Sequence, residues 1–383
     1  MNLTSNWNYP TSISFGPGRI GELSAACLRF GITRPLLVTD AGLAKMGMIA
    51  AAMAGLKAAG LDAALFQDVA PNPVAENVTA GVAAYKAGRH DGVIAFGGGS
   101  ALDAGKAIAF MSGQIRPLWD FEDIGDNYAR ASVAGIAPCI AVPTTAGTGS
   151  EVGRVSVITD AATHTKRLIF HPKILPVAVI SDPELTLGLP PHLTAATGMD
   201  ALAHCLEAFC APGFHPMADG IALEGVRLIH RWLLVAVRDG SNLEARGNML
   251  AAATMGATAF QKGLGLIHSL AHPLGAHYGT HHGLLNGVLM AHVLEFNAGA
   301  IGEKMEVLAR LLDLPRPGLA GVLDWVRGLQ AEIGIPETLR AAGCAVGDVE
   351  AIVAAALVDP TASTNPVALT AAGVRGVLGR VMG

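Results

Sequence analysis

A cluster of histidines is the part of this sequence with the clearest capacity for chemistry. Five of the thirteen histidines fall within HSLAHPLGAHYGTHHG, residues 268–283. The cluster lies in a run from Gly263 to Leu294 that contains no Asp, Glu, Lys or Arg. An imidazole in apolar surroundings is unfavourable unless both ring nitrogens are satisfied by hydrogen bonds or a metal. The cluster therefore predicts a bound group, and its members are His268, His272, His277, His281 and His282.

Two pairs of residues spaced four apart could supply ligands to one metal ion. GMDALAH places Asp200 and His204 on one face of a predicted helix, and LGLIHSLAHPLG places His268 and His272 in the same relation. One carboxylate with two or three imidazoles is a suitable site for Fe(II) or Zn(II). A lone histidine of this kind is more often a hydrogen-bonded core residue, but five in one uncharged run favour a site. Spacing alone leaves open which of the five bind the metal.

Two glycine-rich segments could bind phosphate groups. GVIAFGGGSALDAGKAIAF is predicted to run from a strand through a glycine turn into a helix. There Gly97, Gly98 and Gly99 let the backbone approach a ligand, Ser100 is the expected N-cap, and the helix start attracts a pyrophosphate. PTTAGTGSE, residues 143–151, follows a second strand in the same way. The alternative for each segment is a turn or loop of small residues with a packing role.

Asp40 ends another expected strand, PLLVTD. An acidic residue at that point could bond the two hydroxyls of an adenosine ribose and repel a 2′-phosphate. This interpretation favours NAD over NADP. The alternative is an ordinary N-cap for a helix that begins near Gly42.

Two kinds of structure must position these residues. The first half of the chain alternates short buried strands with Ala-rich helices, which predicts a parallel sheet with helices on both faces. The strands stop near LTLGLPPHL, and long helical patterns follow. We therefore expect an α/β NAD-binding domain over residues 1–185 and an all-helical, metal-binding and catalytic domain over residues 186–383. The expected strands are 35–42, 62–69, 91–100, 139–145 and 177–183.

Composition favours a well-buried enzyme over other classes of protein. The chain is 51% hydrophobic and 15% charged, and its 383 residues suggest two domains. A net charge of -5 without a Lys/Arg block argues against nucleic acid or a membrane surface as partner. The start of the chain lacks the features of a signal peptide, and Pro273 with several glycines argues against a membrane helix in the uncharged run. Five scattered cysteines without a CxxC pair predict no disulfide framework, so the cytoplasm is the expected compartment.

Taken together, these motifs resemble the iron-containing (group III) alcohol dehydrogenase family. The resemblance runs from FGPG (15–18) through VTDAGLAKMG, GGGSALDAGKA, PTTAGTGSE and AATGMDALAHCLEA to GLGLIHSLAHPLGAHYGTHHG. It implies a dehydroquinate synthase-like architecture and a homodimer. It also implies that the metal ligands are Asp200, His204, His268 and His282, and that His272 stands beside the substrate and the nicotinamide. His277 and His281 receive no ligand role from the resemblance.

The same resemblance implies a set of residues that bind the NAD cofactor. The GGGS loop would take the pyrophosphate, Asp40 the adenosine ribose, and Thr144, Thr145 and Lys166 the nicotinamide side. Asn72, in PNP, would line the cofactor cleft. The whole expected set is Asp40, Asn72, Gly97, Gly98, Gly99, Ser100, Asp103, Thr144, Thr145 and Lys166.

The function implied is reversible hydride transfer between a small alcohol and NAD, with the metal polarising the substrate oxygen. His272 could relay the proton to solvent. Alternatives within the superfamily are a glycerol dehydrogenase, a hydroxyacid–oxoacid oxidoreductase and dehydroquinate synthase, which is a lyase. Alternatives from other classes are a metal-dependent hydrolase and a non-catalytic metal-binding protein, and the two phosphate-binding loops argue against both.

A lysine lies shortly before the histidine cluster, in ATAFQKGLGLIH. Phe260 and Lys262 are expected near the mouth of the pocket, where the lysine could attract an anionic substrate. The alternative is a solvated lysine at a helix start.

Overall fold

The computed structural model describes residues 9, 11–163 and 165–383. Over these residues the chain divides into two compact units. The α/β unit comprises residues 9–145 and 149–187, and the helical unit comprises residues 146–148 and 188–383. The domain limits 1–185 and 186–383 stay a prediction.

The α/β unit is built on a six-stranded sheet in the order β1-β8-β5-β4-β2-β3. Every neighbouring pair is parallel, so the predicted parallel sheet is confirmed. All six residues of β4 are buried, because helices cover both faces of such a sheet. The strands are β1 (Ser12–Phe15), β2 (Pro35–Val38), β3 (Ala64–Phe66), β4 (Gly92–Gly97), β5 (Cys139–Pro143) and β8 (Ala178–Ser181).

Two features of this unit were not predicted. β1 is a four-residue edge strand whose polar and apolar residues alternate, so it lacks the buried run that marks the inner strands. β6 (Val155–Asp160) and β7 (Thr165–Phe170) form a separate antiparallel pair. Most of β7 is partly exposed, and its mixed composition resembles a loop when only buried runs are sought.

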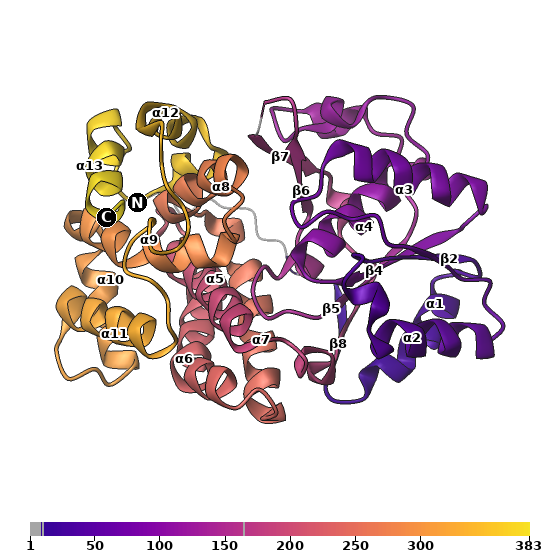
Figure 1. Ribbon diagram of the computed structural model, residues 1–383, viewed down its shortest axis with the longest axis horizontal. Helices are drawn as coiled ribbons and strands as arrows, with labels where there is room; N and C mark the ends of the chain where they lie inside the picture. The colour runs from indigo at the N-terminus through magenta and orange to yellow at the C-terminus, as the bar shows by residue number, and fades with distance from the viewer. Residues whose placement is uncertain (1–8, 10, 164) are drawn as a thin grey trace. The chain divides into compact units, whose positions relative to one another are not determined.

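Helices cover both faces of the six-stranded sheet (Figure 1). On one face lie α1 (Leu23–Arg29) and α2 (Gly47–Ala58). On the other face α4 (Gly99–Met111) packs against β4, with α3 (Ala75–Ala87) beside it. The core beneath α1 and α2 includes Leu23, Leu37, Ile49, Leu56, Ile94 and Ile140.

The strand order reverses direction between β2 and β4. After β2 the chain adds β3 on one side, and then β4, β5 and β8 on the other side. In open α/β sheets, ligands bind at such a switch point, outside the carboxyl ends of the strands. Asp40 follows β2 and the GGGS loop follows β4, so both lie at this edge.

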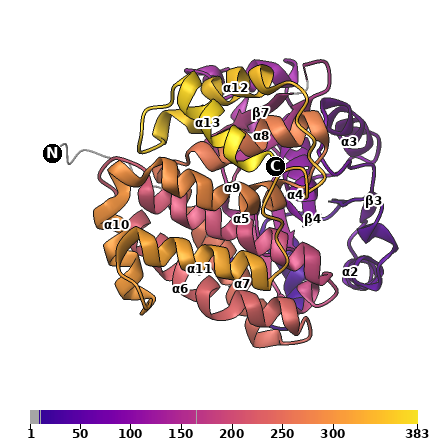
Figure 2. The same cartoon turned by 60° about the vertical axis from the view of Figure 1, so that its left-hand side comes forward.

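The helical unit contains no strand among its described residues. Its central helix is α5, in which every residue from Thr194 to Cys210 is buried. Around it pack α6, α7 and α9 (Figures 1 and 2). The helices of this unit are α5 (Pro191–Cys210), α6 (Pro216–Arg238), α7 (Leu243–Ala259), α8 (Leu266–Tyr278), α9 (His282–Phe296), α10 (Ala298–Leu311), α11 (Gly318–Glu332), α12 (Val349–Val358) and α13 (Ala371–Val381).

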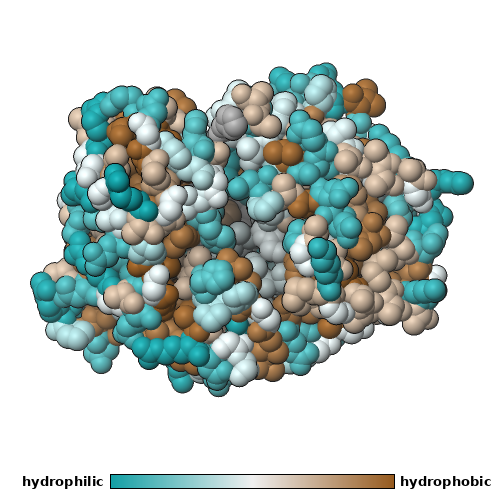
Figure 3. Space-filling model, in the orientation of Figure 1, coloured by the Kyte–Doolittle hydropathy of each residue, from teal (hydrophilic) through white to brown (hydrophobic). Residues whose placement is uncertain are grey.

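No single described helix is long and apolar enough to cross a membrane, although α9 and α10 pass that test as a pair bent by 109°. The helix α9 itself is largely buried within the helical unit. On the face drawn in Figure 3, hydrophobic residues are interspersed with hydrophilic ones.

Candidate metal centre and cofactor loops

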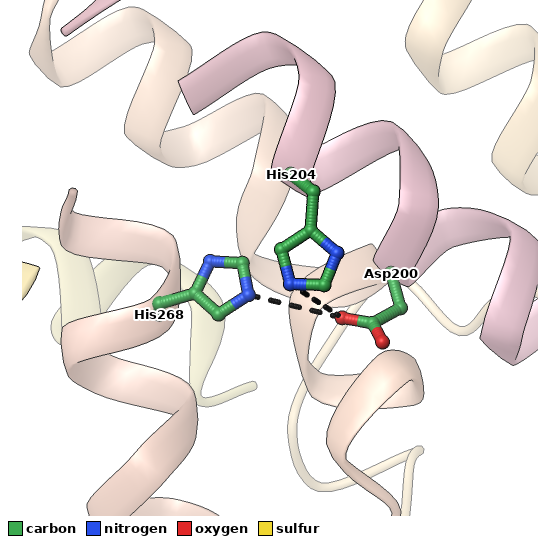
Figure 4. Close-up of side chains that lie close together, drawn as sticks. All are labelled: Asp200, His204 and His268. Carbon is green, nitrogen blue, oxygen red and sulfur yellow. Dashed lines mark ion pairs between the residues drawn. The ribbon is translucent and has the colours of Figure 1, made fainter. Parts of the chain in front are cut away.

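One face of α5 supplies two of the predicted metal ligands. Asp200 and His204 lie one helical turn apart and are 2% and 5% exposed. His268, in the first turn of α8, is 1% exposed and faces them (Figure 4). Because burial of a carboxylate is costly without a partner, this arrangement calls for a compensating charge or a metal.

Among the four predicted ligands, the three imidazole nitrogens lie around one carboxylate oxygen of Asp200. Asp200 Oδ1 lies 3.8 Å from His204 Nε2, 3.8 Å from His268 Nε2 and 3.5 Å from His282 Nε2. The ligand atoms of Asp200, His204 and His268 all lie within 4.8 Å of one another. Donors bound about 2.1 Å from a tetrahedral metal lie about 3.4 Å apart, so a small contraction would close the site. The donor set therefore fits a divalent metal such as Fe(II) or Zn(II).

Close contact between α9 and α5 brings His282 to the other ligands. His282 is the first residue of α9, and Gly283 follows it. A Cβ atom on Gly283 would lie 2.2 Å from the backbone oxygen of Ala196 and 3.1 Å from Asp200 Cβ. Only a glycine permits this approach of the two helices.

Two further buried residues, which were not predicted, contact the predicted ligands. Glu207 Oε2 accepts a hydrogen bond from His268 Nδ1 at 2.6 Å. Asn286 Nδ2 donates to Asp200 Oδ1 at 2.7 Å. Helical spacing places each of them on the face of a predicted ligand, since Glu207 lies three residues after His204 and Asn286 four residues after His282. This spacing does not show which distant residue each of them contacts.

Electrostatics at this site favour a bound cation. Burial alone would raise the pKa of Asp200, but the facing imidazoles outweigh it and hold that pKa far below its ordinary value. Burial is the main cause that lowers the pKa of His204 to about 4. Burial also opposes protonation of His268, but the facing carboxylates of Asp200 and Glu207 raise the pKa of His268 to about 9. Two carboxylates thus concentrate negative charge around these imidazoles.

His272 lies beside the predicted ligands without joining the convergence on Asp200. Its ring stacks on that of His282 with centroids 5.4 Å apart, and Nδ1 lies 2.8 Å from Asp359 Oδ2. Thr361 donates its N–H and its hydroxyl to the other carboxylate oxygen, at 2.9 and 2.6 Å. Burial opposes ionisation of Asp359, yet His272 and these bonds hold the pKa of Asp359 below its ordinary value. The carboxylate therefore fixes the ring of His272, whose catalytic role stays a prediction.

The remaining members of the histidine cluster are exposed. His277 lies near the end of α8, and His281 immediately precedes α9. Of the five histidines in the cluster, His268 and His282 have a ring nitrogen close to Asp200 Oδ1, at 3.8 and 3.5 Å.

Both interpretations of Lys262 are wrong. Its side chain is 2% exposed, and Nζ forms an ion pair with Asp219 Oδ1 and donates to the carbonyl oxygen of Phe209 at 3.3 Å. It is neither a solvated residue nor a free cation for a substrate, because a buried ammonium needs these partners. Phe260 does lie near the site, with its ring centroid 5.1 Å from that of His204.

The GGGS loop is a direct passage from β4 into α4. β4 ends at Gly97, and α4 begins at Gly99 with Gly98 as its N-cap. The prediction that Ser100 is the N-cap is therefore wrong: Ser100 lies inside the first turn, and its hydroxyl donates to the carbonyl oxygen of Pro71. The helix starts earlier because glycine also serves as an N-cap. The N–H groups of this first turn remain suited to an anion.

A close glycine contact holds this helix start against the sheet. A Cβ atom on Gly105 would lie 2.5 Å from the Cβ of Ala95, in the middle of β4. At the loop itself, Gly97 has a φ of 148°, a conformation that other residues rarely adopt.

The strand β5 brings two more predicted residues to the same edge. The N–H of Thr144 donates to the carbonyl oxygen of Gly97 at 3.0 Å. A Cβ atom on Gly98 would lie 3.3 Å from Cγ2 of Thr145. Asp103, one turn into α4, accepts a hydrogen bond from the Ser150 hydroxyl at 2.6 Å and pairs with the buried Lys106 at 3.1 Å. This network was not predicted, and it places Asp103 beneath the loop.

Asn72 and Lys166 are connected to the GGGS loop through neighbouring residues. Asn72 lies between Pro71, which accepts the Ser100 hydroxyl, and Pro73, whose oxygen accepts the N–H of Thr159 at 2.7 Å. Lys166, on β7, stands opposite Thr159 in the pairing of β6 with β7.

Asp40 lies at the carboxyl end of β2, and one of its oxygens has a local partner. Oδ1 accepts the N–H groups of Gly42 and Leu43 at 2.8 and 2.9 Å. These bonds fit the capping alternative, with a 3₁₀ helix (Leu43–Lys45) in place of an α-helix. They also fix the carboxylate at the switch point of the sheet.

Comparison with known proteins identifies the family. Residues 10–183 match the model of the iron-containing alcohol dehydrogenases, and residues 194–382 match the C-terminal model of the Fe-containing alcohol dehydrogenase family. The chain belongs to the iron-containing alcohol dehydrogenase family. The resemblance seen in the sequence is thereby confirmed, and the chain is an oxidoreductase that acts on alcohols.

Relatives of this alcohol dehydrogenase span almost its whole length. A 4-hydroxybutyrate dehydrogenase of Cupriavidus necator is 42% identical over 98% of this chain and 99% of its own. A 1,3-propanediol dehydrogenase of Citrobacter freundii is 38% identical over 92% of each chain. A crystal structure of a 1,3-propanediol oxidoreductase superposes with a TM-score of 0.93 at 35% identity, and covers 99% of this chain and 100% of its own. The alternative of a hydrolase or a non-catalytic metal-binding protein has no such support.

Proposed function

We propose that this dehydrogenase interconverts a short primary alcohol and its aldehyde with NAD, at a metal held by Asp200, His204, His268 and His282. The observation that carries the proposal is the convergence of three imidazole nitrogens on one buried carboxylate oxygen. A bound divalent metal would act as a Lewis acid on the substrate oxygen, and a bound nicotinamide would carry the hydride.

The residues of the chain would hold the reactants and move the proton. His272 is fixed at Nδ1 by Asp359, so Nε2 is the atom that would exchange a proton with the substrate hydroxyl. Phe260, whose ring lies 5.1 Å from that of His204, would exclude water from this side of the centre.

In the α/β unit, the first turn of α4 would bind the pyrophosphate of NAD. Gly97, Gly98, Gly99 and Ser100 lie at this turn, with Asp103 on its next turn. Asn72, Thr144, Thr145 and Lys166 would line the remainder of the cofactor site, and Asp40 would bind the adenosine ribose. The support for the GGGS loop, Asp40, Thr144 and Thr145 is their position at the carboxyl ends of β2, β4 and β5, where α/β sheets bind dinucleotides. Asn72 and Lys166 are included because their neighbours Pro71 and Thr159 contact the GGGS loop and the segment beside it.

Fe(II) is the metal that we propose, with Zn(II) as the alternative. One carboxylate and three imidazoles suit both metals, so the family description supports the choice of iron. Metal analysis of anaerobically purified protein distinguishes the two.

The substrate that we propose is an alcohol with a second polar group at its far end. The relatives from Cupriavidus necator and Citrobacter freundii are named for 4-hydroxybutyrate and 1,3-propanediol, which share this feature. Lys262 is paired with Asp219, so it would not provide the counter-charge for a carboxylate.

A panel of matched alcohols tests the substrate class. Formation of NADH is followed with 4-hydroxybutyrate, 1,3-propanediol and 1-butanol, and each assay is repeated with NADP. We expect kcat/KM to be at least about tenfold higher for one of the first two than for 1-butanol, which corresponds to about 1.4 kcal/mol. Equal values for all three alcohols would contradict the proposed substrate class.

We further propose that the enzyme is a cytoplasmic homodimer that binds neither nucleic acid nor membranes. The five described cysteines are all buried and unpaired with one another, as expected for a reducing compartment. Light scattering coupled to size-exclusion chromatography tests the dimer, and a monomer mass would contradict it.

A further inference from the structure

Glu207 is a buried carboxylate with both oxygens engaged at the start of α8. The residue is 7% exposed and lies on the same helix as Asp200 and His204. Its Oε1 accepts the N–H of Ile267 at 2.7 Å, and its Oε2 lies 2.6 Å from His268 Nδ1. These contacts couple a non-ligating side chain on α5 to a predicted ligand on α8.

We propose that Glu207 is a positioning residue that prepares His268 for the metal. The inference rests on the proposed metal site. A carboxylate accepts hydrogen bonds, so the ring nitrogen that faces it, Nδ1, must carry the proton. In a neutral imidazole the other nitrogen, Nε2, then presents its lone pair, and Nε2 is the atom that faces Asp200 Oδ1.

Both the charge of Glu207 and its second oxygen contribute to this role. Oε1 fixes the backbone of α8 one residue before His268, while Oε2 fixes the ring itself. An amide of the same shape offers one oxygen and one NH₂ group. In a Glu207→Gln variant, the NH₂ group would therefore face a donor, either the N–H of Ile267 or the N–H at Nδ1 of His268. An NH₂ group opposite Nδ1 would favour the tautomer in which Nε2 carries the proton and cannot bind a metal.

The alternative is a purely structural role, in which Glu207 serves as a partner for the first turn of α8. Asn365 provides a matched control, because its Oδ1 accepts the N–H of Leu266 at 3.0 Å in that same turn. The other described hydrogen bonds of the Asn365 side chain are with Asn297 and Val367, and none is with a histidine. An Asn365→Ala substitution removes a partner from α8 without touching His268.

The test compares metal affinity of the full-length wild-type protein, Glu207→Gln and Asn365→Ala. Each protein is stripped with a chelator, and its affinity for Co(II) and Zn(II) is measured by competition, with thermal unfolding of the apo-protein alongside. Glu207→Gln is expected to bind both metals about 10–100-fold more weakly. Asn365→Ala is expected to unfold at a lower temperature and to bind metal within about twofold of wild type.

Two results would overturn the inference. One is wild-type affinity in Glu207→Gln, and the other is an equal loss of affinity in Asn365→Ala. If Glu207→Gln does not fold, Glu207→Asp is used, which keeps both oxygens but retracts them from His268. It should lose affinity several-fold, and wild-type affinity in it would overturn the inference.

A failure of the proposed metal site can be distinguished from a failure of the role proposed for Glu207. If Asp200→Asn binds metal as tightly as wild type does, the metal site itself is misassigned. If Asp200→Asn loses the metal and Glu207→Gln keeps it, the role of Glu207 alone is wrong.

Discussion

At the residue scale, two histidine–carboxylate pairs divide the roles within the histidine cluster. His268 has Glu207 at its Nδ1, and His272 has Asp359 at its Nδ1. In each ring the carboxylate leaves Nε2 for other partners. Nε2 of His268 faces Asp200, whereas His272 lies outside the group of atoms that surrounds the predicted metal position. A carboxylate at Nδ1 thus orients the proposed metal ligand His268 in one case and the proposed proton carrier His272 in the other.

Substitution of His272 by Ala should separate turnover from metal binding. We expect kcat to fall by about 10²–10⁴-fold, because the group that exchanges the substrate proton is lost. Metal content should remain near that of wild type, measured by elemental analysis of the same samples. The exposed His277 offers a control, since His277→Ala should change neither quantity. Loss of metal in His272→Ala would mean that His272 is a ligand.

At the element scale, the geometry of the proposed metal centre depends on how closely α9 approaches α5. His282 reaches Asp200 because Gly283 lets the first turn of α9 contact the backbone of α5. The GGGS loop, which we propose binds the cofactor, depends on a similar contact between α4 and β4 at Gly105. In both cases a glycine, which has no side chain, allows two elements to lie close together. This short distance places the predicted functional residues.

Gly283→Ala should therefore weaken metal binding as well as stability. Its Cβ would meet the Ala196 oxygen at 2.2 Å, so α9 must move away from α5. We expect a destabilisation of about 1–3 kcal/mol by chemical denaturation and a loss of metal affinity by competition titration. The control is Gly302→Ala on α10, where nothing lies within 4 Å of the added methyl group. This control should be neutral or stabilising by up to about 1 kcal/mol. Unchanged metal affinity in Gly283→Ala would show that His282 does not depend on this contact.

Asp40→Asn should shift the cofactor preference. The asparagine can still accept the N–H groups of Gly42 and Leu43, but it no longer repels a 2′-phosphate. We expect the ratio of kcat/KM for NAD over NADP to fall by about tenfold or more. Asp62→Asn, at an exposed position of the same unit, should leave the ratio unchanged. An unaltered ratio in Asp40→Asn would leave Asp40 with its capping role alone.

Local periodicity explains which elements and residues could be predicted. The four-residue spacing of Asp200 and His204 holds because both lie on one continuous helix, and the inner strands are recognisable as apolar runs because both faces are covered. Contacts between distant segments leave no such local signal. Glu207 is separated from its partner His268 by 61 residues, and Asp359 is separated from His272 by 87 residues. The ion pair between Lys262 and Asp219, which shows that both interpretations of Lys262 are wrong, joins residues 43 positions apart in the sequence.

At the scale of the whole molecule, the comparisons identify the family but not the substrate. Matches cover both units, and the relatives align over nearly the full chain. The relatives are named for different alcohols. Their names include 4-hydroxybutyrate, 1,3-propanediol and methanol dehydrogenases. The substrate of this chain is therefore a matter for the panel of matched alcohols.

The most direct measurement of the central claim combines metal content with alcohol oxidation in wild type and Asp200→Asn. Wild type, purified without oxygen, should carry about one metal ion per chain and reduce NAD with an alcohol. Its activity should disappear with a chelator and return with Fe(II) or Zn(II). Asp200→Asn should fold but retain neither metal nor activity. Full activity in the stripped wild-type protein, or a full metal complement in Asp200→Asn, would contradict the account.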